Sequence, residues 1–502
     1  MPGVLAACIP LNPREIIVVA NGCGDETAAV ARRCGCQVVE HSRRLGNDLG
    51  RALGASRATG DILLFLDADF VIPPAQLRRF LTPIINGNAD VVLNDHDALF
   101  HQRKTPHPTT VWRQVFNALL GKEDLGIDSL LSVPHAMTRK VLQTIGVRAL
   151  GNPILAHARI VQYGFRIEHR YPVEVLQYNR YRPTEHTAPP FRLSRSEQRI
   201  IGDHLAALAR VIPHYRGNFS DGGRRRDLVK RMIHEARIAS CVCQGWGVGH
   251  SALYGGKRLS VIIPVQNEAS TIGTVIQQVR KIEPMEIIVV VNGSADDTAQ
   301  IAAAHGARTI VVREALGNDV GRAIGAKLAR GDILLFMDGD FVIPPDQLFP
   351  FAHAVAANEG DLALNDLNHY LRLRYPLNIV TATKYAVNLA LERKELGPAS
   401  MVAVPHAMNS RLLASIHWSS LLSPVVAQVK AVLAGARVVL PQRVEVDRLN
   451  RVRPDQHFAS RGRPPAVERI IGDHVEGLKY LLHAKGERGL FVEDGRAWDL
   501  LP

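Results

Sequence analysis

Several features that would assign this chain to a particular class are missing from it. Its 502 residues contain six cysteines, the last of them Cys243, and neither C-x-C pair has the C-x2-C spacing of a zinc site. No run approaches the about 18 apolar residues of a membrane-spanning helix, and no basic-then-apolar signal segment follows Met1. No basic stripe is interleaved with aromatic residues, which argues against a nucleic-acid partner. We therefore expect a cytoplasmic protein with reduced thiols and at most peripheral contact with a membrane surface.

The composition that is present is that of a globular protein, with 46% apolar and 22% charged residues. At this length the chain should hold two or three domains, each large enough for its own core. The formal net charge of +12 favours anionic partners such as a nucleotide diphosphate. For any single basic cluster, a solvated surface explains the charge equally well.

The chain contains two copies of one sequence, offset by 271 residues. Gly60–Pro74 returns as Gly331–Pro345, and in each copy an apolar run ends in an Asp-x-Asp motif. The match extends to Leu93–Asp95 with Leu364–Asp366, Val133–Met137 with Val404–Met408, and Arg199–His204 with Arg469–His474. We predict a first domain over 1–228, a linker over 229–258 that is interrupted by glycines, and a complete second domain over 259–502.

The first copy begins late in the shared pattern. Met1 corresponds to Ile272, so the counterpart of Ser260–Thr271, a strand and the turn after it, is missing. That strand is expected at the centre of the sheet, where its loss would expose edges and open the core. Two explanations stay open: the true start lies upstream, or the first half is a degenerate and mainly structural copy.

Apolar runs alternate with predicted helices in the second copy. The runs 260–265, 286–291 and 308–312 are short and mostly apolar, which is typical of strands in a parallel sheet covered on both faces. We therefore predict an α/β fold. Polar residues follow these strands, among them Asn267 and Asn292, and ligands of parallel sheets bind at the carboxyl ends of the strands.

Three segments of the second copy, in their order and spacing, resemble a family-2 glycosyltransferase: Ser260–Glu268, Ile288–Thr298, and Leu316–Asp340 with its terminal Asp-x-Asp. The resemblance covers about 80 residues strongly in the second copy and somewhat fewer in the first. It implies two tandem GT-A-like domains, which are Rossmann-like nucleotide-diphospho-sugar transferase folds with mainly parallel sheets. It also implies a nucleotide-diphosphate sugar as the donor and Mg2+ or Mn2+ as the cofactor.

The Asp-x-Asp carboxylates form the predicted metal site. Hard oxygen ligands suit Mg2+ or Mn2+ better than zinc, and a bound metal neutralises charge that develops on a leaving diphosphate. By resemblance Asp340 holds the metal, Asp338 reaches the ribose or the metal through water, and His474 or His457 completes the site. A solvated turn is the alternative for one such motif, but it does not readily explain the return of both carboxylates in the other copy. A lone histidine is more often a structural residue than a ligand.

The resemblance also assigns residues to the donor. The expected nucleotide-sugar contacts are Pro264, Asn267, Glu268, Asn292, Gly293, Arg322 and Asp338. The first-copy equivalents of the site are Asn21, Asp67, Asp69, Asp95 and His135. Two alternatives stay open: Asp296 and Asp297 cap the next helix, and Arg322 lies on the solvated face of its helix.

The general base departs most from the family pattern. Inverting members place an acidic pair somewhat before a segment like Ala434–Arg437, but Ser423–Pro424 stands there, and Asn152–Pro153 in the first copy. None of these takes a proton from an acceptor hydroxyl. Candidates repeated in both halves are Asp366, Glu395 (matched by Asp124) and His406. Otherwise the enzyme retains the anomeric configuration of the sugar, or has lost transfer activity.

The leading hypothesis is metal-dependent sugar transfer to an unknown acceptor, such as an envelope polysaccharide or lipid-linked precursor, by one intact catalytic copy, the second. A nucleotidyltransferase or a dehydrogenase would need a glycine-rich loop where Pro264–Glu268 stands. The alternative is a non-catalytic sugar-nucleotide-binding or scaffold protein, because a strand of the first copy and the acidic pair are missing. Retention of both Asp-x-Asp motifs argues against it, since clustered carboxylates repel each other.

Overall fold

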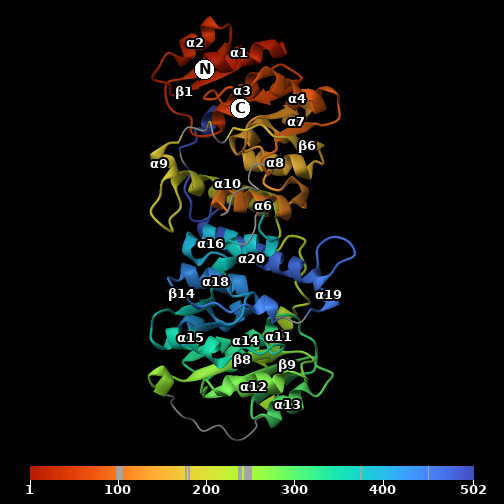
Figure 1. Ribbon diagram of the computed structural model, residues 1–502, viewed down its shortest axis with the longest axis vertical. Helices are drawn as coiled ribbons and strands as arrows, with labels where there is room; N and C mark the ends of the chain where they lie inside the picture. Colours follow the sequence, from red (N-terminus) through yellow and green to blue (C-terminus); the bar gives the residue numbers. More distant parts are fainter. Residues whose placement is uncertain are drawn as a thin grey trace.

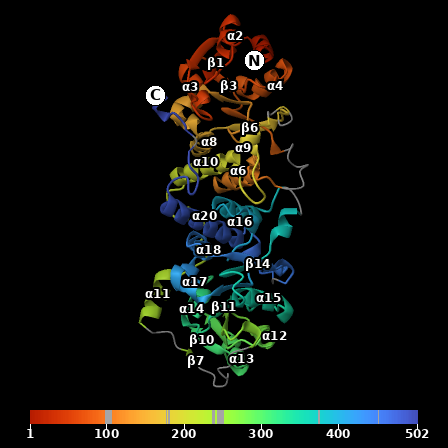
Figure 2. The same ribbon diagram turned by 90° about the vertical axis from the view of Figure 1, so that its left-hand side faces the viewer.

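The computed structural model describes residues 1–97, 106–175, 178, 181–235, 240–241, 252–372, 376–449, 452–493 and 495–501. The molecule is elongated, with an α/β half at each end and a layer of helices between them (Figures 1 and 2). Both chain termini lie on the first half, because the last residues of the chain run back past the helical layer (Figure 1). The predicted α/β fold with two tandem copies is confirmed.

The second half is built on a single mixed sheet. In the described residues it has eight strands in the order β14-β12-β13-β11-β8-β9-β10-β7, and β7 and β13 run antiparallel to their neighbours. The strands are β7 (Ser240–Cys241), β8 (Leu259–Val265), β9 (Glu286–Asn292), β10 (Arg308–Val312), β11 (Ile333–Phe336), β12 (Leu362–Asn365), β13 (His406–Asn409) and β14 (Val438–Gln442). The helices are α12 (Ile272–Arg280), α13 (Thr298–Ala304), α14 (Val320–Leu328), α15 (Pro345–Ala356), α16 (Ile379–Ala390), α17 (Ser410–Ile416), α18 (Pro424–Leu433), α19 (Pro454–His457) and α20 (Pro465–Lys485).

Both faces of this sheet are buried, which explains its nearly continuous apolar strands. Successive residues of β8 enter different cores: Val261 packs with residues of α12 and α15, whereas Ile262 packs with residues of α14 and α18. Because neither face of such a strand meets water, its residues are apolar at successive positions rather than alternately polar. The predicted covered, mainly parallel sheet is therefore confirmed, with β13 as an internal antiparallel strand.

The first half repeats these elements around a divided sheet. Its described strands form a pair, β1 (Ile17–Asn21) with β2 (Gln37–His41), and a separate sheet in the order β3-β5-β4-β6. The latter contains β3 (Ile62–Phe65), β4 (Val91–Asn94), β5 (His135–Thr138) and β6 (Ile167–Tyr171). The helices are α1 (Pro2–Cys8), α2 (Thr27–Arg33), α3 (Leu49–Arg57), α4 (Pro74–Ile85), α6 (Pro108–Leu119), α7 (Arg139–Ile145), α8 (Pro153–Gln162), α9 (Pro183–His186) and α10 (Arg195–Val211), and the next helix, α11 (Arg226–His234), lies against α14 of the second half.

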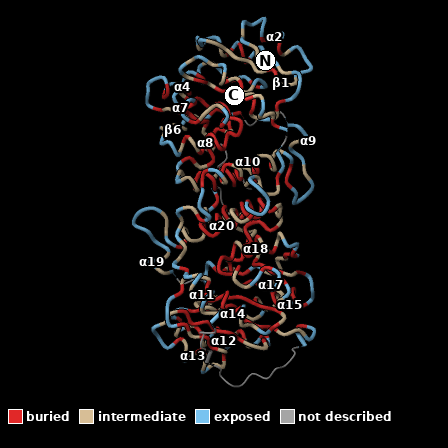
Figure 3. The backbone as a smooth tube through the Cα atoms, turned by 180° about the vertical axis from the view of Figure 1, so that it is seen from behind, coloured by how far each residue is buried: buried red, intermediate tan, exposed pale blue. Residues whose placement is uncertain are grey.

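The division falls where the sequence lacks a strand. In the second half β8 lies between β9 and β11, and β1 and β3 are the first-half equivalents of those two strands. Among the described residues β1 pairs only with β2, and most of β1 is half-exposed where β9 is buried. Figure 3 shows the same difference, with buried backbone concentrated in the second half and in the helical layer.

The two halves share one core at the helical layer. Helix α6 packs on its repeat equivalent α16, and α10 packs on α20. Trp112 and Leu205 of the first half lie in one apolar cluster with Tyr385 and Leu478 of the second half. Equivalent helices meeting each other is the geometry of a two-fold homodimer, here within one chain.

The segment expected to be a linker is partly structured. Helix α11 reaches into it and buries Val229 in the core of the second half, and β7 pairs with β10 at the edge of that sheet. Residues 236–239 and 242–251 of this segment lie outside the described residues. In the described part of the chain, no helix has both the length and the apolar composition needed to cross a membrane.

Candidate functional site

Polar residues gather at the carboxyl edge of the second sheet. Strands β8, β9, β11 and β12 all end at this edge, and the antiparallel β13 begins there with His406. Asp338 and Asp340 follow β11, and Asp366 follows β12. The strand directions therefore bring carboxylates from distant parts of the sequence to one side of the sheet.

The Asp-x-Asp carboxylates lie between two arginines. Arg322 Nη2 donates to Asp338 Oδ1 at 2.8 Å, and Arg453 Nη2 lies 3.1 Å from Asp340 Oδ2. The side chain of Asp340 is 11% exposed, and its Oδ1 is buried without a hydrogen-bond partner among the described residues. Burial and the charge of Asp338 raise the pKa of Asp340, although Arg453 opposes this. An unsatisfied carboxylate oxygen beside a second carboxylate suits a cation.

A cavity of about 470 Å3 lies beside Arg453, the arginine that contacts Asp340, and is lined by Gln266, Asn267, Glu268, Val452, Arg453, Pro454 and Asp455. Glu268 is buried in its wall: its backbone N–H donates to Thr298 Oγ1 at 2.8 Å, and its Oε1 lies 2.5 Å from Arg453. Asn267 has φ +57° and accepts from the Ala295 N–H at 2.8 Å. The turn after β8, which contains two predicted donor contacts, is thus fixed to the turn after β9.

Arg322 does not lie on a solvated face, so that alternative is wrong. Its side chain is 8% exposed and donates from Nη1 to Asp319 Oδ1 and from Nη2 to Asp338 Oδ1, both at 2.8 Å. Burial disfavours the charged guanidinium, but the ion pairs with Asp338 and Asp319 outweigh it and raise the pKa of Arg322. Arg322 is therefore a fixed positive charge directly behind the Asp-x-Asp motif.

Asn292 and Gly293 shape the next turn. The Asn292 amide accepts from the Leu316 N–H at 2.7 Å and donates to Gly317 O at 2.9 Å, so it clamps the loop before α14. Gly293 has φ +67°, and a Cβ there would lie 2.7 Å from the Ala315 backbone. Asp296 accepts from the Thr298 N–H at 3.1 Å at the start of α13, so the capping alternative holds for Asp296, whereas the side chain of Asp297, at the N-cap position, makes no capping hydrogen bond. Pro264 lies within β8 under α14, where it contacts Gly321.

The two histidines singled out from the sequence differ in their surroundings: His474 is buried, whereas His457 is exposed. His474 is on α20 with Nδ1 2.7 Å from Ile470 O, and burial, with Lys384 nearby, lowers its pKa to about 4. Among the described residues no group of three or more His, Cys, Asp or Glu side chains forms a metal cluster, so His474 is not joined to Asp338 and Asp340. His457 is exposed on α19, and its Nδ1 accepts from the Arg453 N–H.

The three candidates for a base have different surroundings. His406 stacks on Phe336 with ring centroids 4.9 Å apart, and burial, with Arg322 nearby, lowers its pKa to about 3. Glu395, in the 3-10 turn Lys394–Leu396, is ion-paired with Arg393. Asp366 Oδ1 accepts from the Asn368 N–H at 2.9 Å, at the same sheet edge as Asp338.

The first half repeats several contacts of the second-half site, but its Asp-x-Asp motif is more exposed to solvent. Arg51 bonds Asp67 at 3.2 Å as Arg322 bonds Asp338, and Asn21 clamps Leu45 as Asn292 clamps Leu316. His135 stacks on Phe65, and Asp95 follows β4. Asp69, however, is exposed, whereas its equivalent Asp340 is mostly buried.

Sequence reasoning missed Arg453 and Asp319 as parts of the site. Both residues are identical in the two copies of the repeat, Arg453 with Arg182 and Asp319 with Asp48, and this identity could have indicated them. Only the tertiary contacts show that Arg453 reaches Asp340 and that Asp319 orients Arg322.

Both halves of the chain match one protein-family model. The family model described as "Glycosyl transferase family 2" matches residues 3–146 and 260–406, one segment in each half. Together these segments make up more than half of the chain.

Individual relatives match shorter stretches. Glucosyl-3-phosphoglycerate synthase of Mycolicibacterium paratuberculosis is 34% identical over 148 residues, which is 27% of this chain and 43% of the relative. The undecaprenyl-phosphate 4-deoxy-4-formamido-L-arabinose transferase of Yersinia enterocolitica is 28% identical over 103 residues, 18% of this chain and 32% of the relative. The matches thus span less than half the length of these curated relatives. A crystal structure of glucosyl-3-phosphoglycerate synthase from Mycobacterium tuberculosis with UDP is 24% identical, with a TM-score of 0.32, covering 42% of this chain and 78% of that one.

Proposed function

The chain belongs to glycosyl transferase family 2, and we propose that its second half transfers a sugar from a nucleotide-diphosphate donor with Mg2+ or Mn2+ as cofactor. The observation that carries the proposal is the pair Asp338 and Asp340 beside the cavity lined by the turn after β8. The buried, unpartnered Oδ1 of Asp340 is an oxygen that a cation would satisfy.

The residues present suit a divalent metal. Asp338 and Asp340 would hold it through carboxylate oxygens, the ligands that Mg2+ and Mn2+ prefer. When bound, the metal supplies Lewis-acid neutralisation of charge on the leaving diphosphate. Arg322 adds a fixed positive charge behind the motif, and Glu268 and Asn267 line the cavity where the donor would bind.

The second half is proposed as the active copy because its Asp-x-Asp motif is the more buried of the two. Asp340 is mostly buried next to Glu268 and Arg453, whereas its equivalent Asp69 is exposed. An exposed carboxylate interacts more weakly with a cation, since water screens the attraction. We propose that the first half is mainly structural and supports the second half through the shared helical core.

Asp366 is proposed as the base if transfer inverts the configuration. It lies at the carboxyl edge of the sheet, and Oδ1 is held by the Asn368 backbone. A histidine with a pKa of about 3, such as His406, is a weak base near neutral pH. Changing Asp366→Asn should lower kcat by about 10²-fold or more with little change in donor KM. An unchanged kcat would remove Asp366 from this role.

The donor is tested first by binding. Thermal shift and calorimetry with UDP, GDP, ADP and their glucose conjugates, with and without Mn2+, should give metal-dependent stabilisation by one nucleotide. The Asp338→Ala/Asp340→Ala variant is the control and should lose it. Among these donors, a nucleotide-diphosphate glucose with 3-phosphoglycerate is a sensible first pair, because one curated relative is named glucosyl-3-phosphoglycerate synthase. Stabilisation by no nucleotide, in a protein shown to be folded, would overturn the proposal.

A non-catalytic sugar-nucleotide-binding protein is the second candidate. It is favoured by Ser423 and Pro424, which stand at the start of α18 where an acidic pair was expected. Metal-dependent nucleotide binding with no transfer to any of a panel of acceptors, and no hydrolysis of the donor, would support it. The acceptor, the cytoplasmic location and the absence of a nucleic-acid partner stay predictions.

A further inference from the structure

Two arginine-bearing segments cross between the halves. The first strap, residues 216–226, is near the C-terminal end of the first repeat but lies on the second half. The second strap, residues 488–493 and 495–498, is the C-terminal end of the second repeat and lies on the first half. The C-terminal end of the chain seen beside α3 and α7 in Figure 1 is the continuation of the second strap. Each repeat thus gives its C-terminal segment to the other.

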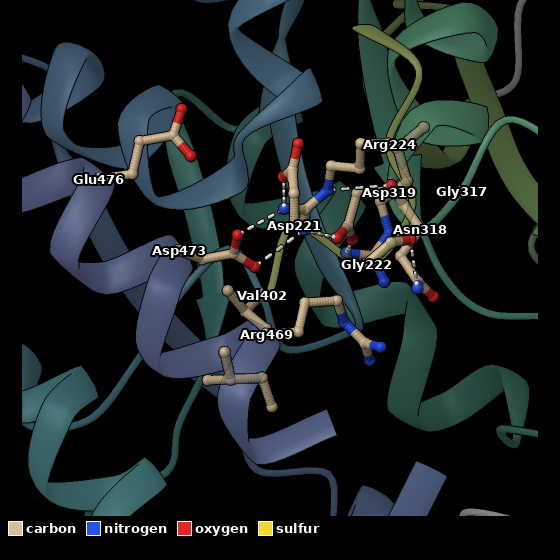
Figure 4. A network of polar contacts seen from close by, with 12 residues as sticks. Asp221, Gly222, Arg224, Gly317, Asn318, Asp319, Val402, Arg469, Asp473 and Glu476 are labelled. Carbon is tan, nitrogen blue, oxygen red and sulfur yellow. Dashed lines mark hydrogen bonds and ion pairs between the residues drawn. The ribbon is translucent and has the colours of Figure 1, made fainter. Parts of the chain in front are cut away.

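Arg224 anchors the first strap to the second half. Its Nη1 and Nη2 donate to the two carboxylate oxygens of Asp473 on α20 at 2.6 and 2.9 Å, and Nη2 also bonds Asp319 at 2.5 Å. Figure 4 shows Arg224 between these two carboxylates. Its side chain has no solvent exposure, so water does not weaken these ion pairs.

The backbone of the strap packs directly on the loop before α14. The Arg225 N–H donates to Leu316 O at 2.9 Å, and Arg224 Nε donates to Asn318 O at 3.1 Å. A Cβ on Gly317, at φ +89°, would lie 2.4 Å from the Gly223 carbonyl group. The loop therefore needs glycine because the strap of the other repeat lies against it.

The same contacts recur on the first half. Arg496 Nη1 and Nη2 donate to Asp203 at 2.6 and 2.7 Å, and Nη2 lies 3.3 Å from Asp48. The Ala497 N–H donates to Leu45 O at 3.0 Å, and a Cβ on Gly46 would lie 3.0 Å from Arg496 Cα. Two independent copies of one arrangement argue against a chance surface contact.

In the second half this contact leads to the Asp-x-Asp motif. Asp319 has a left-handed φ of +62° and accepts from Arg224 at Oδ2 and from Arg322 at Oδ1, and Arg322 in turn donates to Asp338. Burial opposes ionisation of Asp319, but Arg224 and Arg322 outweigh it and hold the pKa of this carboxyl well below its usual range. A buried charge with both partners in place is held in one geometry, and it becomes costly when one partner is removed.

We propose that Arg224, contributed by the first repeat, is a positioning residue for the donor site of the second half. Through Asp319 it fixes Arg322, and thereby the side chain of Asp338, which would hold the metal. Without Arg224, the buried Asp319 would keep its hydrogen bond from Arg322 but lose the one from Arg224. The loop 316–319 would also lose its support from the strap. The effect on donor binding rests on the proposed function, whereas the support of the loop does not.

The test uses three variants of the full chain: Arg224→Ala, Arg224→Lys and the matched Arg496→Ala in the second strap. Hydrogen exchange of ligand-free protein is measured over 314–322 and 43–51. Arg224→Ala should speed exchange at 314–322 only, and Arg496→Ala at 43–51 only. Equal exchange at 314–322 in wild type and Arg224→Ala, with both proteins folded, would overturn the proposal.

Donor binding is the second readout. Arg224→Ala should raise the Kd for the nucleotide and Mn2+ by about tenfold, Arg224→Lys should recover part of this loss, and Arg496→Ala should stay within about twofold of wild type. In turnover the change should appear in donor KM more than in kcat, because Arg224 touches neither substrate nor metal. Equal losses in Arg224→Ala and Arg496→Ala would mean general destabilisation and would overturn the positioning role.

The two proposals fail in different ways. If wild type binds no nucleotide but Arg224→Ala still loosens 314–322, the strap supports the loop and the proposed function is wrong. If wild type binds a nucleotide and Arg224→Ala binds it equally well, the function stands and Arg224 is not a positioning residue.

Discussion

Arg453 Nη2 lies 3.1 Å from Asp340 Oδ2 and 2.5 Å from Glu268 Oε1, so one guanidinium bridges the proposed metal ligand and the wall of the donor cavity. In this arrangement a positive side chain stands next to the carboxylate that a metal would use. A cation approaching Asp340 must compete with it, because both are attracted by the same oxygen.

We expect Arg453→Ala to raise the affinity of the nucleotide-free protein for Mn2+ by about tenfold, since the competing guanidinium is gone. Mn2+ binding is measured by calorimetry or electron paramagnetic resonance. Arg182→Ala, which changes the exposed repeat equivalent, should have no effect. Weaker or unchanged Mn2+ binding in Arg453→Ala would show that the arginine does not compete with the metal.

The two Asp-x-Asp motifs should differ in importance. Asp340→Asn should abolish transfer, because the mostly buried Asp340 is the proposed metal ligand, whereas Asp69→Asn changes an exposed side chain and should reduce transfer less. Initial rates with saturating donor and Mn2+ make the comparison. Equal loss in both variants would rule out a single active copy.

Gly339 should tolerate no side chain, although its repeat equivalent is alanine. A Cβ on Gly339 would lie 2.3 Å from Val265 Cγ1, in the core beside β8. In the first half Ala68 stands at this place, and among the described residues no equivalent of β8 faces it. We expect Gly339→Ala to cost about 1–3 kcal/mol of stability through overpacking.

Ala68→Gly is the control for this substitution and should change stability by less than about 1 kcal/mol, because the site is exposed and not in a helix. Urea unfolding followed by circular dichroism measures both. A Gly339→Ala protein as stable as wild type would mean that β8 moves away without cost.

Stability should fall on mild acidification because of buried histidines. Burial lowers the pKa of both His204 and His474 to about 4 in the folded protein, against about 6.5 in an unfolded chain. Between these values the unfolded state binds more protons, so stability is complete above about pH 6.5 and is lost as the pH falls toward 4. Each such histidine contributes a slope of up to about 1.4 kcal/mol per pH unit.

The His204→Gln/His474→Gln variant should therefore show a weaker dependence of Tm on pH between 6.5 and 4.5 than wild type. His483→Gln, which changes an exposed histidine on the same helix as His474, should leave the dependence as it is. The slopes are compared rather than the absolute Tm values, because glutamine also alters packing. Parallel slopes in all three proteins would contradict the prediction.

Much of the fold could be predicted because it depends on local pattern. Apolar runs such as 286–291 specify strands buried on both faces, and the repeat marks what both halves share. The strand Ser260–Val265 was expected at the centre of its sheet, and β8 does lie between β9 and β11. The Asp-x-Asp motif was found at the edge where parallel strands end, because that location follows from strand direction alone.

Individual side chains were harder to predict. One sequence-based alternative placed Arg322 on the solvated face of its helix. Arg322 is buried instead, because α14 packs on β8 and directs this side chain toward Asp338. His474 was considered as a metal ligand, yet it lies in the helical layer, because α20 packs against the first half. The partner of a side chain depends on the relative placement of elements, which periodicity does not encode.

The sequence alone determined the α/β class, the duplication and the place of the carboxylates, since these follow from residue type and spacing along the chain. Only the tertiary structure decided that the halves meet through equivalent helices and exchange their C-terminal segments, so that Arg224 of one repeat reaches Asp319 of the other. The physical reason is that such contacts depend on how two folded surfaces complement each other. Ion pairs between residues far apart in sequence form only when both surfaces bury them together.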